Sequence, residues 1–362
     1  MGIATCEGIA VMKRKEIKHR GTEDHRGIQI AFLCASLCLC ISIPVFAEDH
    51  PGILVVLGAE GTPEFGKQFK AAATEWESAA KKADEKILVL GSDATDKEKT
   101  DKSKLERTLK DTPKESAQPY WLILIGHGTY DGKRAKFNLR GPDVTAAEFA
   151  EWLRPFERPV VIINCASSSA PFIRQLSGPD RVIITATKSG YEMNVTRFAP
   201  HMAKAIGDAT SDLDKDGQTS VLEAWLFASR AVADSYKLQA RLATEHSLLD
   251  DNGDELATPA EWFRGVRATK KARGDSDTDG LRAHQIHLIR SARERAMPDN
   301  IRKKRDALEI KIIRLRENRG ELSDDAYYAA LEPMLVELAK LYEDAESSDD
   351  APKKDDALRA NP

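Results

Sequence analysis

Short apolar runs separated by polar stretches dominate the chain between residues 50 and 206. Five runs are rich in β-branched residues and have the length of strands, at 53–57, 87–90, 120–125, 159–163 and 181–186. Helices are predicted between them, at 63–83, 96–110, 145–153, 170–176 and 195–206, and Thr62 is a suitable N-cap for the first. Strands that alternate with helices predict an α/β fold, in which helices cover both faces of a parallel sheet.

Beyond residue 206 the strand pattern ends, and the rest of the chain is predicted to be helical. Apolar positions at 301–319, and then at steps of three and four from Tyr328 to Tyr342, predict an antiparallel helical hairpin that turns at 320–324. Pro333 should kink or start the second helix. The hairpin is a candidate surface for a partner or for self-association, and the polar stretch 346–362 is predicted to be a disordered tail.

The N-terminal residues have the pattern of an export signal. An uncharged apolar stretch at 27–47 follows several basic residues and ends in Val45-Phe46-Ala47. A basic region, an apolar region and a small residue before the cut are typical of a signal peptide, predicted here as residues 1–47. The protein is then exported, to a periplasm or outside the cell, with no membrane contact after cleavage. An uncleaved membrane anchor is the alternative, because about 20 apolar residues can span a bilayer.

Composition narrows the function classes. The 362 residues are 41% hydrophobic, which suffices for a core. Their net charge of −4 gives no general case for nucleic-acid binding. Four of the five cysteines lie in the predicted signal peptide. The body of the protein therefore has neither a disulfide framework nor a cysteine-based zinc site, and its single thiol is Cys165.

Two successive apolar strands end in reactive side chains. The run 120–125 leads into His127 and Gly128, and the run 159–163 leads into Asn164 and Cys165. Sites form at the carboxyl ends of parallel strands, where an imidazole can accept the thiol proton and leave a thiolate nucleophile. The N–H groups of Gly128 and Cys165 can then form an oxyanion hole. Taken singly, the histidine and the cysteine each favour an ordinary structural role. Taken together, in a mature chain with one cysteine, they are as consistent with catalysis as with structural roles.

The stretches WLILIGHG (121–128) and VVIINCASS (160–168) resemble the motifs of the caspase-fold cysteine peptidases of clan CD. Within that group the chain is most similar to legumain-like peptidases, in which a serine also stands two residues after the cysteine. The resemblance covers 53–206 and implies a caspase/legumain-like α/β fold for 48–206. It also implies a protein or peptide substrate, with His127 as general base, Cys165 as nucleophile and Gly128 as oxyanion donor. Asn164 and Ala166 depart from the family pattern and leave the substrate preference open.

The acidic stretch 212–223 fits the twelve-residue EF-hand calcium loop. Gly217 occupies the sixth position, where the loop turns sharply. The expected oxygen ligands are Asp212, Asp214, Asp216, Gln218 through its carbonyl, Ser220 and Glu223.

The stretch 250–261 repeats this pattern, with Glu255 in place of the glycine. A positive φ at Glu255 should cost about 1 kcal/mol. The expected oxygen ligands are Asp250, Asn252, Asp254, Leu256 through its carbonyl, Thr258 and Glu261.

The two loops begin 38 residues apart, which leaves room for two connecting helices. They predict an all-α, EF-hand-like segment at 207–270 that binds Ca²⁺, followed by a helical region at 271–345. Thr219 and Ala257 argue against a standard pair, because a large apolar residue normally bridges the loops at this eighth position. A third stretch, 275–280, repeats only the opening of the pattern and is predicted to be a solvated loop.

The leading prediction is an exported, calcium-stabilised cysteine endopeptidase that acts through a thioester on Cys165. Glu192, after the strand that follows Cys165, either recognises a basic substrate side chain or is a solvated loop residue. A non-catalytic calcium-binding scaffold, or pseudo-peptidase, that acts through protein contacts is the main alternative. A redox-sensing thiol at Cys165 is a third.

Overall fold

A seven-stranded sheet forms the centre of the computed structural model, which describes residues 50–93, 100–273 and 277–349. The sheet order is β10-β9-β8-β7-β3-β1-β2. Its parallel part confirms the five predicted strands, as β1 (Ile53–Leu57), β2 (Ile87–Leu90), β3 (Tyr120–Ile125), β7 (Val160–Asn164) and β8 (Arg181–Thr185).

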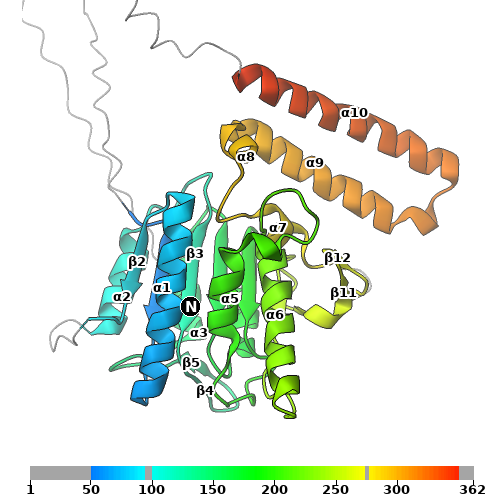
Figure 1. Cartoon of the computed structure of the whole chain (residues 1–362). Helices are drawn as coiled ribbons and strands as arrows, with labels where there is room; N and C mark the ends of the chain where they lie inside the picture. The colour runs from blue at the N-terminus through cyan, green and yellow to red at the C-terminus, as the bar shows by residue number, and fades with distance from the viewer. Residues whose placement is uncertain (1–49, 94–99, 274–276, 350–362) are drawn as a thin grey trace, which may run out of the picture. The chain divides into compact units, whose positions relative to one another are not determined.

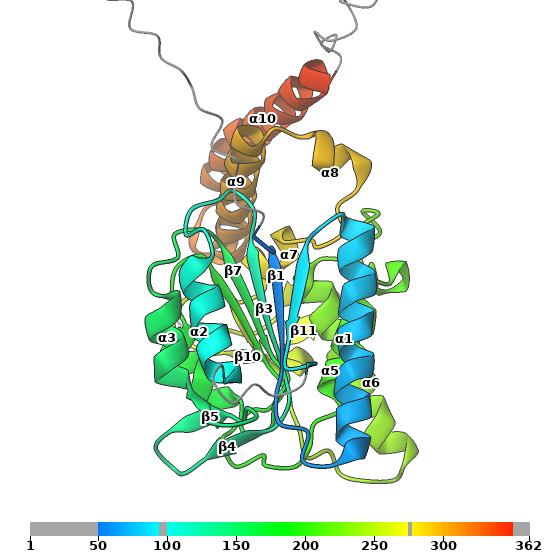
Figure 2. The same cartoon turned by 90° about the vertical axis from the view of Figure 1, so that its left-hand side faces the viewer.

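Helices cover both faces of the sheet, as predicted (Figures 1 and 2). One face carries α1 (Pro63–Ala83), α5 (Phe198–Ile206) and α6 (Val221–Leu238). The other carries α2 (Asp101–Asp111), α3 (Ala146–Leu153) and the short pair η1 (Ala170–Phe172) and α4 (Ile173–Leu176). Side chains alternate along a strand, so β1 sends Val55 to the first core and Val56 to the second. Both faces of the central strands must therefore be apolar, which explains their unbroken hydrophobic runs.

The expectation of an all-α segment after residue 206 is wrong. Strands β9 (Leu248–Asp250) and β10 (Thr258–Pro259) extend the main sheet in antiparallel pairing beside β8. Helix α6 joins the same core as α1 and α5, and its Trp225 is fully buried there. These strands have three and two residues and lie beside acidic loops, so no periodic apolar run marks them in the sequence.

Several short elements complete the fold. A small sheet of β4 (Gly128–Tyr130), β5 (Ala135–Phe137) and β6 (Val144–Thr145) follows β3, and β11 (Phe263–Arg264) pairs with β12 (Arg267–Ala268). The remaining short helices are η2 (Ala209–Ser211), η3 (Ala260–Trp262), α7 (Leu281–Gln285), α8 (Ala292–Ala296) and η4 (Arg319–Glu321).

The predicted helical hairpin is confirmed as α9 (Asp299–Glu317) and α10 (Asp324–Asp349). The two helices share a small apolar cluster built on Leu308, Ile312 and Leu341. Pro333 lies inside α10 rather than at its start. Leu335 on α10 is 43% exposed, and a partner surface on this hairpin stays a prediction.

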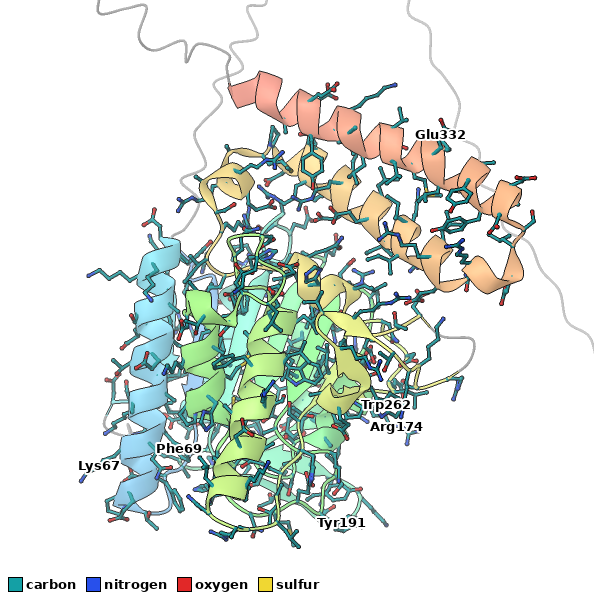
Figure 3. All side chains as sticks on the ribbon, turned by 45° about the vertical axis from the view of Figure 1, so that its right-hand side comes forward. Lys67, Phe69, Arg174, Tyr191, Trp262 and Glu332 are labelled. Atoms are coloured by element: carbon teal, nitrogen blue, oxygen red, sulfur yellow. The ribbon has the colours of Figure 1, made fainter. Side chains whose placement is uncertain are left out.

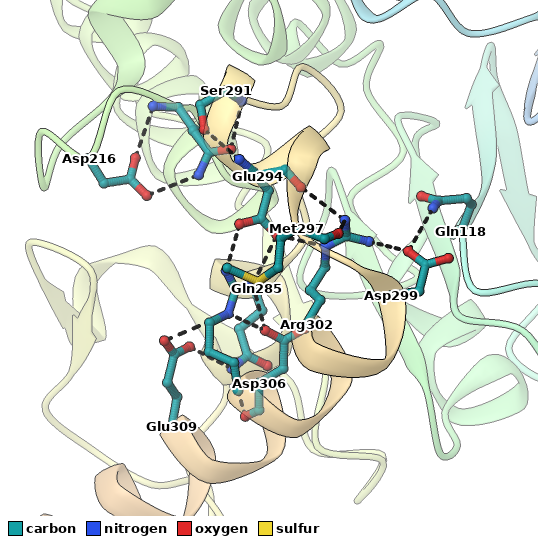
Figure 4. A network of polar contacts seen from close by, with 12 residues as sticks. Gln118, Asp216, Gln285, Ser291, Glu294, Met297, Asp299, Arg302, Asp306 and Glu309 are labelled. Carbon is teal, nitrogen blue, oxygen red and sulfur yellow. Dashed lines mark hydrogen bonds and ion pairs between the residues drawn. The ribbon is translucent and has the colours of Figure 1, made fainter. Parts of the chain in front are cut away.

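Ion pairs and hydrogen bonds connect the hairpin to the segment before it (Figure 4). Both terminal guanidinium nitrogens of Arg305 on α9 donate to the buried carboxylate of Glu294 on α8, at 2.6 and 2.9 Å. Burial opposes ionisation of Glu294, yet the hydrogen bond and charge of Arg305 hold its pKa below the usual value. Gln285 on α7 donates to the Asp306 carbonyl at 2.9 Å.

Two predicted segments fall partly or wholly outside the described residues. The signal peptide at 1–47 lies outside them and stays a prediction. The predicted tail at 346–362 begins within α10, and residues 350–362 lie outside the description. Among the described helices, none combines the length and the apolar character needed to cross a bilayer.

The Trp225→Ala substitution should lower the free energy of unfolding by about 3–5 kcal/mol, because it empties a fully buried site. Leu238→Ala on the same helix is the matched control, since Leu238 is 88% exposed and its loss should cost less than about 0.5 kcal/mol. Urea unfolding followed by circular dichroism measures both values. A separate, earlier transition for Trp225→Ala would contradict a core shared by α6 and the sheet.

Candidate active site

The two candidate catalytic residues follow neighbouring strands. Strand β7 pairs in parallel with β3, and Leu124 lies opposite Asn164. The pairing continues past the end of β7, because the Cys165 N–H donates to the Leu124 carbonyl at 2.8 Å. His127 therefore leaves the sheet edge two residues after β3, beside the point where Cys165 leaves β7. The predicted adjacency of these strand ends is confirmed.

Two aromatic rings and one carbonyl orient the half-buried His127 imidazole. The rings of Phe65 and Phe69 on α1 meet the imidazole edge-on, at centroid distances of 5.2 and 5.3 Å. Its Nε2 lies 3.2 Å from the Glu60 carbonyl. A carbonyl only accepts, so this contact assigns the hydrogen to Nε2 and leaves Nδ1 as the basic nitrogen of the neutral ring. Phe69 also belongs to the core cluster that contains Cys165.

The Cys165 thiol is buried. The residue is 1% exposed, and burial raises the pKa of its thiol, with a further contribution from the charge of Glu245. Among the described residues no hydrogen bond joins this thiol to His127. The Cys165 carbonyl accepts from the Thr196 hydroxyl at 2.5 Å. In this conformation Cys165 is a protonated core residue rather than a thiolate.

The two expected oxyanion donors, the N–H groups of Gly128 and Cys165, both have hydrogen-bond partners in this conformation. The Gly128 N–H donates to the Ser167 hydroxyl at 3.1 Å, and that hydroxyl donates back to the Gly128 carbonyl. The second expected donor, the Cys165 N–H, bonds to Leu124. A Cβ at Gly128 would lie 2.2 Å from the Ser167 carbonyl, so this contact requires glycine. Gly128 and Ser167 lie 39 residues apart, so no local sequence pattern predicts this contact.

A loop after β8 covers the residues beside Cys165. The Glu192 carbonyl accepts from the Ser168 N–H at 2.9 Å, and the Thr187 hydroxyl accepts from the Ser169 N–H at 2.9 Å. Tyr191 of this loop stacks edge-on against Tyr130 and lies toward the lower end of Figure 3, as does Phe69. Residues 187–197, called loop 187–197 below, follow β8 and are hydrogen-bonded to the turn that follows the cysteine.

The expectation of a solvated Glu192 side chain is wrong. Its carboxylate already has partners within the protein, so in this conformation it is not free to bind a basic substrate side chain either. Its carboxylate is 13% exposed and accepts from the N–H groups of Lys188 and His246. One of its oxygens also lies 2.5 Å from His246 Nδ1. His246 directly precedes the chain that enters β9, in the segment that the sequence analysis assigned to helices, so its role was missed.

The first acidic loop brings three predicted ligands together. The carboxylates of Asp212, Asp214 and Asp216 offer oxygens that all lie within 4.8 Å of one another. Glu223 caps α6 with Ser220 through one oxygen and accepts from the Leu213 N–H through the other. His284 also reaches Asp214, at 2.9 Å, a contact that the sequence analysis did not predict. The Gln218 side chain donates from Nε2 to Asp216 at 3.3 Å, and its Oε1 accepts from the N–H of Ser291.

The second acidic loop contradicts the predicted helix-loop-helix pair, because it joins strand β9 to strand β10. Asp250, Asn252, Asp254 and Leu256 lie in this turn, and Thr258 begins β10. Glu261 is exposed in η3 and lines a cavity of about 660 Å³ together with Glu245 and His246.

Of the third acidic stretch, predicted to be a solvated loop, residues 275 and 276 lie outside the described residues, and the prediction is wrong for Asp279. Asp279 is 2% exposed, and its carboxylate accepts from the Asp251 N–H at 3.1 Å and from the Thr258 hydroxyl. Asp251 in turn accepts from the N–H groups of Gly280 and Ala283. Burial and the neighbouring Asp251 charge raise the pKa of Asp279 to about 8.

Comparison with known proteins finds a distant structural likeness and no match in sequence. No family model and no curated protein matches the chain. The Drosophila initiator caspase Dronc is 11% identical, with a TM-score of 0.36 over 55% of this chain and 78% of that chain. Caspase-1 from Spodoptera frugiperda is also 11% identical, with a TM-score of 0.37 over 56% of this chain and 87% of that chain. Similarity at this level assigns neither a family nor an activity.

Because its thiol is buried and its pKa raised, Cys165 should react slowly in the folded chain near neutral pH. In a chain that starts at Glu48, where Cys165 is the only cysteine, a small thiol reagent should label it at least roughly 100-fold faster in urea than in native buffer. Both rates are measured by the absorbance of the coloured thiol that the reagent releases when it reacts with Cys165. Equal rates would contradict the burial of the thiol.

Proposed function

We propose that this protein is a cysteine endopeptidase whose nucleophile is Cys165 and whose general base is His127. The observation that carries the proposal is the parallel pairing of β3 with β7, from which His127 and Cys165 leave the same sheet edge. Both contribute to the side of the sheet covered by α1, since Phe69 contacts the imidazole and shares a core cluster with the cysteine. The proposed substrate is a protein or peptide.

The proposed reaction uses ordinary thiol chemistry. His127 Nδ1 accepts the Cys165 proton, and the thiolate attacks the scissile carbonyl carbon, forming the C–S bond. The imidazolium returns the proton to the leaving amine as the C–N bond breaks, which leaves a thioester. Water, deprotonated by the same imidazole, then hydrolyses the thioester to the acid and regenerates the thiol.

This chemistry requires a conformation more open than the one described. The Ser167 hydroxyl must leave the Gly128 N–H before that group can stabilise an oxyanion. Exposure of the thiol requires movement of loop 187–197, which Thr196 fastens to the Cys165 carbonyl. The described conformation is therefore, in this proposal, the resting state of the enzyme.

A second candidate function is a non-catalytic scaffold that retains the fold of a peptidase. The burial of Cys165 to 1% exposure and the occupied N–H groups of Gly128 and Cys165 favour it. The two candidates differ in one respect that can be measured, because only an enzyme opens to expose the thiol to a substrate.

Substitution of Cys165 by alanine should lower the hydrolysis of a diverse peptide mixture at least about a thousandfold, because the nucleophile is lost. His127→Ala should lower it about 100-fold or more, since proton transfer is lost. His201→Ala, which removes a histidine from α5, is the matched control and should leave the cut positions unchanged. Mass spectrometry of the products measures each result.

A thiol-reactive peptide probe separates the two candidates without knowledge of the substrate. Labelling of Cys165 that His127→Ala abolishes and His201→Ala preserves would support the peptidase. If the wild-type chain is folded by circular dichroism yet neither cuts peptides nor takes up the probe, the peptidase proposal fails and the scaffold stands.

A further inference from the structure

The two acidic loops have the same backbone, although one precedes a helix and the other joins two strands. The fourth residue of each loop has a positive φ, at 65° for Lys215 and 81° for Gly253. The sixth residue does too, at 88° for Gly217 and 66° for Glu255. Glu255 thus adopts the strained conformation that the sequence analysis associated with a calcium loop at this position.

The side-chain contacts of the two loops also correspond. The first residue accepts from the N–H of the fourth, in Asp212 with Lys215 and in Asp250 with Gly253. The third accepts from the fifth, and the fifth from the seventh, in both loops. The turn 250–256 therefore positions its oxygen-bearing side chains as the turn 212–218 does.

The loops differ in what satisfies their carboxylates. In the first loop the second oxygen of Asp212 accepts from the Gly217 N–H at 3.1 Å. In the second loop the corresponding Glu255 N–H donates to the Ser177 hydroxyl instead. The Asp250 Oδ2 atom is left buried with no hydrogen bond of good geometry, in a residue that is 1% exposed. Burial raises the pKa of Asp250, and the nearby Ser177 hydroxyl offsets that rise only in part.

A second carboxylate in the same turn is in the same situation. The Asp254 Oδ2 atom is also buried without a hydrogen-bond partner. Among the ion pairs of the described residues, none involves Asp250 or Asp254, and the nearest cation contact in the turn is Arg174 with Glu255 at 3.7 Å. In each residue Oδ1 accepts a backbone N–H, while Oδ2 lacks a partner, in the buried Asp250 and in the partly buried Asp254. Burial of an unpaired carboxylate oxygen is costly, so two such oxygens in one turn favour a compensating cation.

We infer that the turn 250–256 is a Ca²⁺ site, held by the side chains of Asp250, Asn252 and Asp254 and by the carbonyl of Leu256. Oxygen ligands of this kind, with two carboxylates, suit a hard divalent cation, and an irregular turn suits the flexible coordination of Ca²⁺. The site excludes Glu261, which lies exposed in η3. It does not depend on the proposed peptidase activity.

The first loop does not carry the same inference. Both oxygens of Asp212, Asp214 and Asp216 already have protein partners. The loop with the stronger sequence match is thus the one whose carboxylates are satisfied. Asp250 lies at the end of β9, so a cation in the second loop stabilises the β9–β10 edge of the main sheet.

The test compares calcium binding by the full chain and by three variants, after removal of divalent ions with a chelator. Calorimetric titration with CaCl₂ should show binding, and the thermal midpoint of the wild-type chain should rise with added CaCl₂. D250N and D254N should each weaken the tightest binding step at least about tenfold, because each removes a charged ligand. D216N changes the same fifth position in the first loop as D254N does in the second, and should keep the tightest step.

Stability without calcium distinguishes a ligand from a structural side chain. D250N should unfold at the same or a higher temperature than the wild-type chain in chelator, because it removes an unpaired buried charge, while losing the rise caused by CaCl₂. The inference is overturned if the wild-type chain shows no binding heat. It is equally overturned if D250N and D254N bind as the wild type does, or if D216N alone abolishes the tightest step.

Discussion

The register between β3 and β7 is the constraint on which the candidate site depends. It places Leu124 opposite Asn164, and the next bond of the ladder fixes the Cys165 backbone to β3. That ladder survives only if both strands stay buried on both faces, which their unbroken apolar runs ensure. A shift of one residue would turn every side chain of β7 to the opposite face. The packing of the core therefore determines where His127 and Cys165 lie at the strand ends.

The same packing keeps the site closed. The Ser167 hydroxyl exchanges two hydrogen bonds with the Gly128 backbone, and loop 187–197 is tied to Cys165 and to the β9 side of the sheet. Glu245 accepts from the Arg197 N–H with both oxygens, and Glu192 holds His246. The segment that leads into β9, with Glu245 and His246, thus holds the loop beside the cysteine. The peptidase and scaffold interpretations differ in whether this loop opens.

The sequence predicts those features that depend on periodicity. The parallel strands, the capped start of α1 and the C-terminal hairpin follow from apolar runs and helical spacing. It fails where a contact between distant segments decides the outcome. Strands β9 and β10 are too short to show a pattern, and the partner of Gly128 is a serine 39 residues away. The acidic loops are a second example. The first matches the calcium-loop pattern better in sequence, but a contact in the second loop depends on Ser177, which is remote in sequence and accepts from the Glu255 N–H.

The capping box at the start of α6 has a consequence for ligand exchange. Glu223 uses one oxygen to hold Ser220 and the other to hold the Leu213 backbone, so the first acidic loop is already fastened at both ends. An ion that took this carboxylate as a ligand would compete with those hydrogen bonds. The net free energy of binding would then be only the difference between the two sets of interactions. The first acidic loop is therefore held in shape by its own hydrogen bonds, and an ion bound there would gain little from Glu223.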